Sequence, residues 1–284
     1  IEETGASAEQ VTRAFLVARE IFGLAGYVEA IENLDNVVST AIQTELYLEF
    51  RRLLDRAVRW FLAARPGVID IQGEIDRFGG HVAQLAPMVP DLLTGEVKSR
   101  FEDVAEHYVS EGVPVELARQ AGALLDLYSL LDIVDIAADT GRDPAVVAEV
   151  YYLVSERFGI DELLIKVARL PREERWDALA RGALRDDLYS VLQALTRAVL
   201  SEESSDPANA QEQYDHWVTG RADTIARTSG PLAAIVRMET PTVAALSVAL
   251  RTLRAVLTTG SSPHEASVEE HEGETARRYE ALGK

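Results

Sequence analysis

Three aspartates at helical spacing are the first residues in this sequence that could do chemistry. Asp132, Asp135 and Asp139 stand at i, i+3 and i+7, so a helix would carry them on one face. Carboxylates grouped in this way can transfer protons or hold a cation. Because large aliphatic residues flank them, we interpret them instead as the wet stripe of an otherwise buried helix.

Two histidines each follow a carboxylate by one helical turn. Asp103 precedes His107, and Glu212 precedes His216, both at i, i+4. Each pair supplies half of a metal site, but no further ligand stands nearby in the sequence. Pairing on a helix surface therefore explains both pairs better.

An arginine face with a neighbouring tyrosine could grip a carboxylate or a phosphate. Arg181, Arg185 and Tyr189 stand one helical turn apart from one another. Asp177 lies one turn before Arg181, so an ion-paired helix face is the competing interpretation. The three tryptophans fall in helical apolar patterns and are expected in the core: Trp60, Trp176 and Trp217.

The sequence predicts no catalytic, cofactor-binding or metal-binding residue. It lacks the dinucleotide-binding glycine motif, the P-loop, the G-x-S-x-G elbow and the H-E-x-x-H motif. It also has no cysteine, which excludes disulfides and thiolate chemistry. Only three lysines occur, none in a recognisable catalytic setting: Lys98, Lys166 and Lys284.

Composition and charge exclude two classes of partner. The net charge of −19 repels phosphate backbones, and no basic stripe offsets it, so nucleic-acid binding is not expected. The most apolar run, 121–138, is interrupted by three aspartates, so we expect no membrane span.

The elements that must position these residues are helices. No run of alternating β-branched residues bounded by turns predicts a strand. Val11, Phe15, Ala18 and Phe22 fall at i, i+4, i+7 and i+11, which predicts one buried helix face.

Local signals mark where the first helix and a similar later helix begin and end. Ser7 is a predicted N-cap, with Gln10 completing a capping box, and Gly23 is the predicted left-handed stop. Later in the chain, Asp143 takes the cap and Pro144 the first helical position.

These two helices begin a longer internal sequence similarity, here called the echo. At an offset of 136, residues 4–24 and 140–160 share six identities in 21 positions, including a Thr-Gly start and a Phe-Gly stop. The stretches 45–62 and 183–200 then align as long helices. We interpret the echo as an internally duplicated unit of a medium, a short and a long helix. Convergence between unrelated amphipathic helices is the alternative.

The predicted fold is therefore all-α, a bundle-like arrangement of many helices that contains the duplicated three-helix unit. We expect one helical domain over 1–257, divided into a first unit (1–65), connecting helices (66–135), a second unit (136–200) and closing helices (201–257). We expect residues 258–284 to form a polar, flexible tail in which His264 and His271 lie among solvated glutamates.

Several blocks together resemble one family. They include "EETGASAEQVTRAFLVAREIFGL", "LLDIVDIAADTGRDPAVVAEVYYLVSERFGIDELL", "RWDALARGALRDDLYSVLQALTRAVL" and "TPTVAALSVALRTLRAVL". In this order they resemble the C-terminal helical region of the large bacterial NAD-specific glutamate dehydrogenases, over about residues 1–257 but not the tail.

The resemblance implies what the residues alone do not. It implies an enzyme that oxidatively deaminates L-glutamate to 2-oxoglutarate and ammonia with NAD, is cytoplasmic and forms a homo-oligomer. The family's catalytic lysines and dinucleotide fold lie upstream, so the resemblance assigns no catalytic residue and no bound cofactor here. It makes this region an accessory domain for packing, assembly or regulation, whose partner is the catalytic part of the same polypeptide.

A free-standing helical interaction protein is the competing reading, in which grooves between helices would hold partner helices. The first residue is Ile1 rather than methionine. We expect from this a region of a longer polypeptide.

Overall fold

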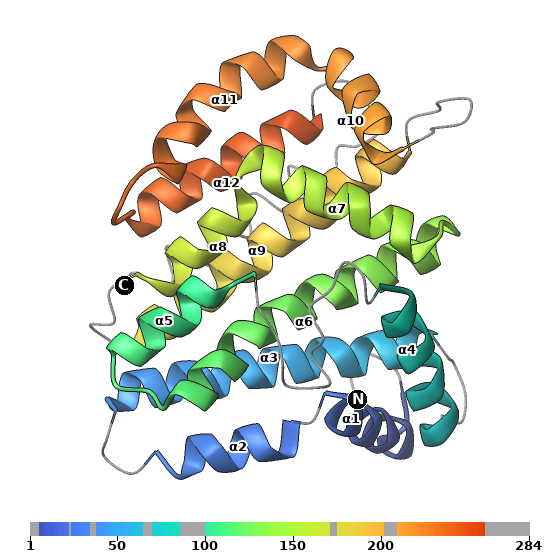
Figure 1. The fold of residues 1–284 in the computed structure, drawn as a ribbon, viewed down its shortest axis with the longest axis vertical. Coiled ribbons are helices and arrows are strands. Elements are labelled where there is room, and N and C mark those ends of the chain that lie inside the picture. The colour runs from blue at the N-terminus through green and yellow to red at the C-terminus, as the bar shows by residue number, and fades with distance from the viewer. Residues whose placement is uncertain are drawn as a thin grey trace. The chain divides into compact units, whose positions relative to one another are not determined.

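The structure is a computed structural model that describes residues 6–22, 24–34, 38–64, 70–85, 100–170, 175–201 and 209–258. Within these ranges it contains twelve α-helices and no strand (Figure 1). The predicted all-α fold is therefore confirmed.

The chain separates into two compact units, Ile1–Glu149 and Val150–Lys284, here called unit 1 and unit 2. Unit 1 holds the first six helices: α1 (Ala8–Ile21), α2 (Leu24–Glu32), α3 (Thr40–Ala64), α4 (Ile71–Leu85), α5 (Glu102–Ser110) and α6 (Val115–Thr140). The next helix, α7 (Pro144–Phe158), contains the point of division. Unit 2 holds the rest: α8 (Ile160–Ala168), α9 (Arg175–Leu200), α10 (Ala210–Thr219), α11 (Ala222–Val236) and α12 (Val243–Thr258).

The predicted helix caps are present where the structure describes them. The Ser7 hydroxyl accepts a hydrogen bond from the Gln10 backbone N–H at 3.2 Å, and the Gln10 side chain accepts one from the Ser7 N–H at 2.8 Å. Asp143 accepts a hydrogen bond from the Ala145 N–H at 2.8 Å. These bonds satisfy backbone donors that have no partner inside the first turn.

The glycine between α7 and α8 takes the expected left-handed conformation. Gly159 has φ +63°, and α7 ends one residue before it. A glycine suits this position because a side chain would clash with the backbone. Its predicted counterpart Gly23 lies outside the described residues.

The apolar face predicted for α1 coincides only in part with the buried one, because Ala18 is shared and Phe15 is not. Phe15 is 39% exposed, whereas Ala14, Val17 and Ala18 are fully buried. The buried side of α1, which packs on α3 and α4, is formed by Ala14, Val17, Ala18 and Ile21. Residue size alone does not determine which side of an amphipathic helix is covered.

In unit 1 the long helix α3 is the centre of packing. It contacts α1, α2 and α6, and α1 also contacts α4. α6 contacts α2 as well and forms a helical hairpin with α5. The core between these helices is mainly aliphatic, with buried aromatic residues such as Tyr27, Phe61 and Phe101.

In unit 2 the long helix α9 has the same role. It contacts α8, α10 and α12, and α11 forms a helical hairpin with α12. Trp217 of α10 is fully buried, as predicted, and its ring lies 6.3 Å from that of Phe158 and 6.2 Å from that of Tyr214. Trp60 is only half-buried, and the side chain of Trp176 lies outside the described residues.

The helix lengths follow the medium, short and long pattern that the echo predicts. α1, α2 and α3 have 14, 9 and 25 residues, and α7, α8 and α9 have 15, 9 and 26. In each unit the helices after this set end in a hairpin (α5–α6, α11–α12) whose second helix packs on the long one. Superposition of the two sets stays a prediction.

Some predicted boundaries fall outside the described residues. Residues 86–99, within the predicted connecting helices, lie outside the described part of the chain, and α5 begins at Glu102. Residues 202–208, at the start of the predicted closing helices, and the predicted tail from residue 259 also lie outside the described residues. The single domain over 1–257 and its subdivision stay predictions.

Candidate functional site

Helix α6 of unit 1 buries two carboxylates in an apolar setting. Asp126 is 2% and Asp132 0% exposed, and Ser129 between them is 1% exposed. They are buried because α2, α3 and α5 all pack against this one helix. A carboxylate without a partner would be very costly at such a depth, so each needs a counter-charge or hydrogen bonds.

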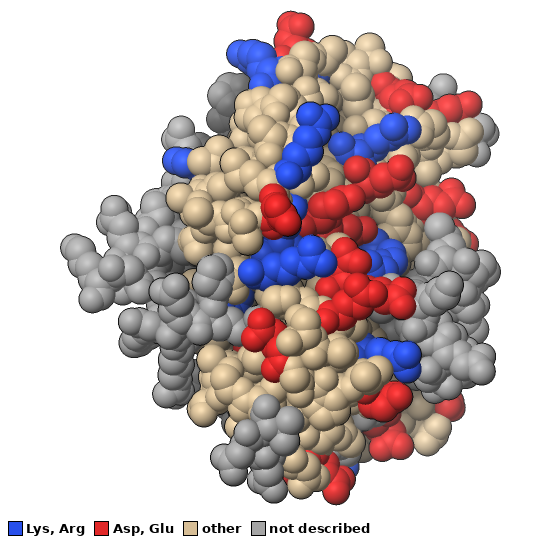
Figure 2. Space-filling view, turned by 60° about the vertical axis from the view of Figure 1, so that its left-hand side comes forward, with Lys and Arg blue, Asp and Glu red and all other residues tan. Residues whose placement is uncertain are grey.

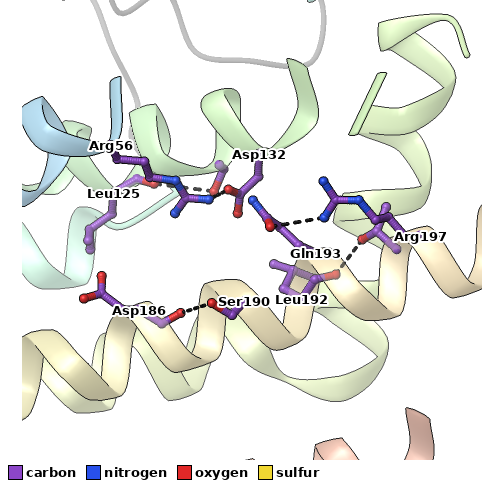
Figure 3. Close-up of polar contacts among 10 residues, drawn as sticks. Arg56, Leu125, Asp132, Asp186, Ser190, Leu192, Gln193 and Arg197 are labelled. Atoms are coloured by element: carbon purple, nitrogen blue, oxygen red, sulfur yellow. Dashed lines mark hydrogen bonds and ion pairs between the residues drawn. The ribbon is translucent and has the colours of Figure 1, made fainter. Parts of the chain in front are cut away.

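Arg56 of α3 supplies the counter-charge for Asp132. Its guanidinium forms an ion pair with the carboxylate across the α3–α6 contact, and Figure 3 shows the two side chains pointing toward each other. The Arg56 guanidinium carbon also lies 5.5 Å from the centre of the Tyr128 ring. The Arg56 side chain remains 28% exposed, so its stem crosses apolar surface while part of it meets water.

Arg100, in the turn before α5, performs the same role for Asp126. Its Nε lies 3.3 Å from Asp126 Oδ1, and its Nη2 donates to the Ser129 hydroxyl at 2.9 Å. One arginine therefore contacts two buried polar groups one helical turn apart.

A buried tyrosine–glutamate contact extends this arrangement along α3. The Tyr108 hydroxyl of α5 donates to Glu45 Oε1 at 3.0 Å, and Glu45 is 1% exposed. The Tyr128 hydroxyl donates to the backbone carbonyl of Glu49 at 3.5 Å, and Arg52 lies 3.8 Å from the Glu49 carboxylate.

We call these side chains the α3–α6 polar layer. It comprises Glu45, Glu49, Arg52, Arg56, Arg100, Tyr108, Asp126, Tyr128, Ser129 and Asp132. Its four carboxylates face three guanidinium groups. The layer can fix the positions of α3, α5 and α6 along one another, because each polar contact requires one particular pair of residues, whereas apolar packing tolerates several alignments.

The interpretation of the aspartates as a wet stripe is therefore wrong for Asp132. Asp135 is half-buried and Asp139 exposed, so only the end of the series meets water. A signal for the burial was present in the sequence. α6 is apolar on nearly all sides, and a helix covered all round must bury its acids and pair them.

Unit 2 has its own ion pair between corresponding helices. Arg254 of α12 donates from Nη2 to Asp187 Oδ1 of α9 at 3.1 Å, with both side chains partly exposed. The sequence pattern singled out neighbours of Asp187 instead. Arg181, Arg185 and Tyr189 are buried and do not form an exposed helix face. Their contact with a carboxylate or phosphate stays a prediction.

The histidine–carboxylate pairs remain ordinary surface features. Asp103, Glu212 and His216 are exposed and His107 is half-buried. Among the described residues, no group of three histidine, aspartate or glutamate side chains is placed to hold a metal ion. His264 and His271 lie outside those residues.

Tyr214 is the described group with a clear electrostatic perturbation. Burial raises its pKa above the ordinary value of 10.0, the positive charge of Arg157 opposes this, and Asp215 adds to it. The Arg157 guanidinium carbon lies 6.0 Å from the Tyr214 ring centre. Tyr214 packs on the aromatic residues at the end of α7, so this perturbation belongs to the core.

The lysine that the structure describes, Lys166, binds the C-terminal end of a helix and is not part of a catalytic arrangement. Lys166 Nζ of α8 donates to the backbone carbonyl of Met238, just beyond the end of α11. A cation at the C-terminal end of a helix opposes the negative end of its dipole. The other two lysines, Lys98 and Lys284, lie outside the described residues.

The surface carries charge of both signs. Figure 2 shows acidic and basic side chains interspersed among the described residues of one face, rather than one broad basic patch. In the described part of the chain, no helix combines the length and apolarity that crossing a membrane requires.

Comparison with known proteins gives a consistent family. The family model "Glutamate dehydrogenase, C-terminal" matches residues 1–255. The chain is 36% identical over 259 residues to the NAD-specific glutamate dehydrogenase of Mycobacterium tuberculosis, covering 91% of this chain and 16% of that protein. It is 35% identical over 226 residues to the enzyme of that name from Pseudomonas aeruginosa, covering 80% of this chain and 14% of that protein.

A third relative, the NAD-specific glutamate dehydrogenase of Halomonas elongata, is 34% identical over 219 residues, covering 77% of this chain and 14% of that protein. This chain thus spans only about one sixth of the length of the relatives it matches. The family match itself covers nearly all of the described helices. The chain therefore belongs to the family of glutamate dehydrogenase C-terminal regions.

Proposed function

We propose that this chain is the accessory C-terminal part of a longer polypeptide that oxidatively deaminates L-glutamate to 2-oxoglutarate and ammonia with NAD. The observation that carries the proposal is the family match over residues 1–255. The relatives are NAD-specific glutamate dehydrogenases, and their activity and cofactor support the proposal. Its direct partner is the remaining, catalytic part of the same polypeptide, in a cytoplasmic homo-oligomer without nucleic-acid or membrane partners.

The described residues support an accessory role. The polar groups that are buried in unit 1 bind one another across α3, α5 and α6, which is the behaviour of a scaffold. A dinucleotide is normally held where a strand meets a glycine-rich turn and a helix. The described elements are all helices, and the described glycines with positive φ lie in helix-to-helix turns. They do not fit NAD, so we assign the cofactor to the rest of the polypeptide and no catalytic, cofactor or metal residue to this chain.

The test compares three proteins: the full-length polypeptide, the same polypeptide truncated before this region, and this chain alone. NADH absorbance is followed with saturating L-glutamate. We expect turnover by the full-length protein, none by this chain, and weakened turnover after truncation that is accompanied by loss of assembly or thermal stability. Turnover by this chain alone would overturn the accessory role.

The competing function is a free-standing helical interaction protein. The open reading frame distinguishes the two, since an accessory part requires a long coding stretch upstream of Ile1. An inactive full-length polypeptide would remove the support for the enzymatic assignment and leave the interaction protein as the better account.

A further inference from the structure

The outer face of α11 is exposed along its whole length. The helix buries Thr224, Leu232 and Ile235, which lie on the side toward α12. On the opposite side five residues are exposed, and they share one face: Asp223, Ala226, Gly230, Ala234 and Arg237. Residues seven apart are related by about 700°, within about 20° of two full turns, so Asp223, Gly230 and Arg237 form the centre line of this face.

Residues at equal distances before and after Gly230 are either identical or opposite in charge, so this face is complementary to itself. Asp223 and Arg237 lie seven residues before and after the glycine, and they carry opposite charges. Ala226 and Ala234 lie four residues before and after it, and they are identical. If a second α11 ran antiparallel across this face with both glycines at the crossing, Asp223 of one copy would meet Arg237 of the other, twice over.

Neither of these two charged residues has an ion pair within the described part of the chain. The arginine beside them differs, since Arg227 donates to the Asp223 carbonyl at 3.3 Å and to the Thr224 hydroxyl at 3.2 Å. Arg227 is thus held on its own helix, whereas the Asp223 carboxylate and the Arg237 guanidinium remain available to opposite charges from outside.

The face also has room for a close helix. A Cβ built on Gly230 would meet nothing within 4 Å. With alanine on either side of the glycine, another helix backbone can approach closely, as small residues allow at helix crossings. Met238, which is 42% exposed, directly follows Arg237 at the end of this strip.

We propose that α11 is an isologous interface at which a second copy of this chain docks its own α11 antiparallel, centred on Gly230. A two-fold axis requires that each surface complement itself, and the face pairs Asp223 with Arg237 in this way. The inference rests on the proposed self-association and adds its surface. At a small crossing angle, both charge pairs lie about 10 Å from the crossing point, within the contact length of two packed helices.

The experiment measures the mass of the whole 284-residue chain by sedimentation across a range of concentrations. Gly230→Leu places a side chain at the crossing, and Gly26→Leu is the matched control, because Gly26 is also helical, exposed and open in front. Leucine favours helix over glycine in general, but Gly230 precedes Pro231, and a Cβ before proline disfavours the helical conformation. Circular dichroism of both variants therefore checks that each keeps the helix content of the parent chain. Asp223→Arg, Arg237→Asp and the double exchange test the charge pairs.

We expect a dimer in the parent chain and in Gly26→Leu, and a monomer in Gly230→Leu. Each single charge reversal should weaken the dimer about tenfold, because it replaces two exposed attractions by repulsions, and the double exchange should restore it. A parent chain that stays monomeric would overturn this surface, but not the proposed function, because the longer polypeptide can assemble through its other parts. A dimer that survives Gly230→Leu, or reversals that the double exchange does not rescue, would overturn this surface alone.

Discussion

Arg56 of α3 and Asp132 of α6 form an ion pair of unequal burial, in which the aspartate is 0% and the arginine 28% exposed. The carboxylate has therefore lost its water, while the guanidinium has kept part of its own. Removing either partner has different consequences, because only the aspartate would be left as a buried charge.

The first prediction uses this asymmetry. Arg56→Ala should destabilise the fold by roughly 3 kcal/mol, because Asp132 would be left buried and unpaired. Asp132→Asn should cost less, about 1–2 kcal/mol, since the amide can still accept a hydrogen bond and the arginine can turn to water. Urea unfolding measures both. Asp139→Asn, exposed on the same helix, is the control and should change little; equal costs for the first two would contradict the asymmetry.

A second prediction concerns the left-handed glycines. Gly159→Ala should be more destabilising than Gly141→Ala, although both have φ near +60°. An alanine at either position costs about 1 kcal/mol for the left-handed backbone. At Gly159 the new Cβ would also lie 3.0 Å from Val236 Cγ2, whereas at Gly141 it meets nothing within 4 Å. Thermal unfolding compares the two, and Val236→Ala should recover part of the difference.

The third prediction tests the buried hydrogen bond between α3 and α5. Tyr108→Phe should destabilise the fold by roughly 1–3 kcal/mol, because the buried Glu45 carboxylate loses one hydrogen-bond donor where water cannot easily replace it. Tyr47→Phe is the matched control, since Tyr47 is 46% exposed. Chemical denaturation that finds the two variants equal would show that the Tyr108 hydroxyl does not contribute to stability.

The fourth prediction is a dependence on alkaline pH. Burial raises the pKa of Tyr214 above 10.0 in the folded chain, so the unfolded chain releases this proton first as the pH rises. Its contribution to stability is therefore complete below pH 10 and is lost as the pH rises toward the folded pKa. The free energy of unfolding, measured from pH 8 to 11, should fall less steeply for Tyr214→Phe than for Tyr47→Phe. Equal slopes would contradict the prediction.

Local signals made much of the fold predictable. Ser7 with Gln10, and Asp143 with Pro144, mark helix starts by hydrogen bonds that depend only on nearby residues. The order of medium, short and long helices could also be read from apolar spacing. The duplication remains to be tested by superposition, and unrelated crossing of α1 with α3 and α7 with α9 would contradict it.

The polar layer was harder to predict because its contacts are long-range. Asp126 and Arg100 are 26 positions apart, and Glu45 and Tyr108 are 63 apart. A spacing rule within one helix shows which residues share a face, but not which helix covers that face. For the same reason, spacing along one helix predicts that water reaches Asp132 and that Phe15 lies on a buried face, and the structure shows neither.

The ion pair of α3 with α6 and the ion pair of α9 with α12 have opposite polarity, and this bears on how a chain with two long central helices avoids mispairing while it folds. In unit 1 the arginine lies on the long helix α3 and the acid on α6; in unit 2 the acid lies on α9 and the arginine on α12. α12 carries two arginines and no acid, so exchanging it for α6 would leave Arg56 without a counter-charge. While the chain folds, the charges on α6 and α12 therefore distinguish the two hydrophobic hairpins, α5–α6 and α11–α12. A hairpin that packs on the wrong long helix leaves a charge unpaired, which disfavours such misfolded intermediates.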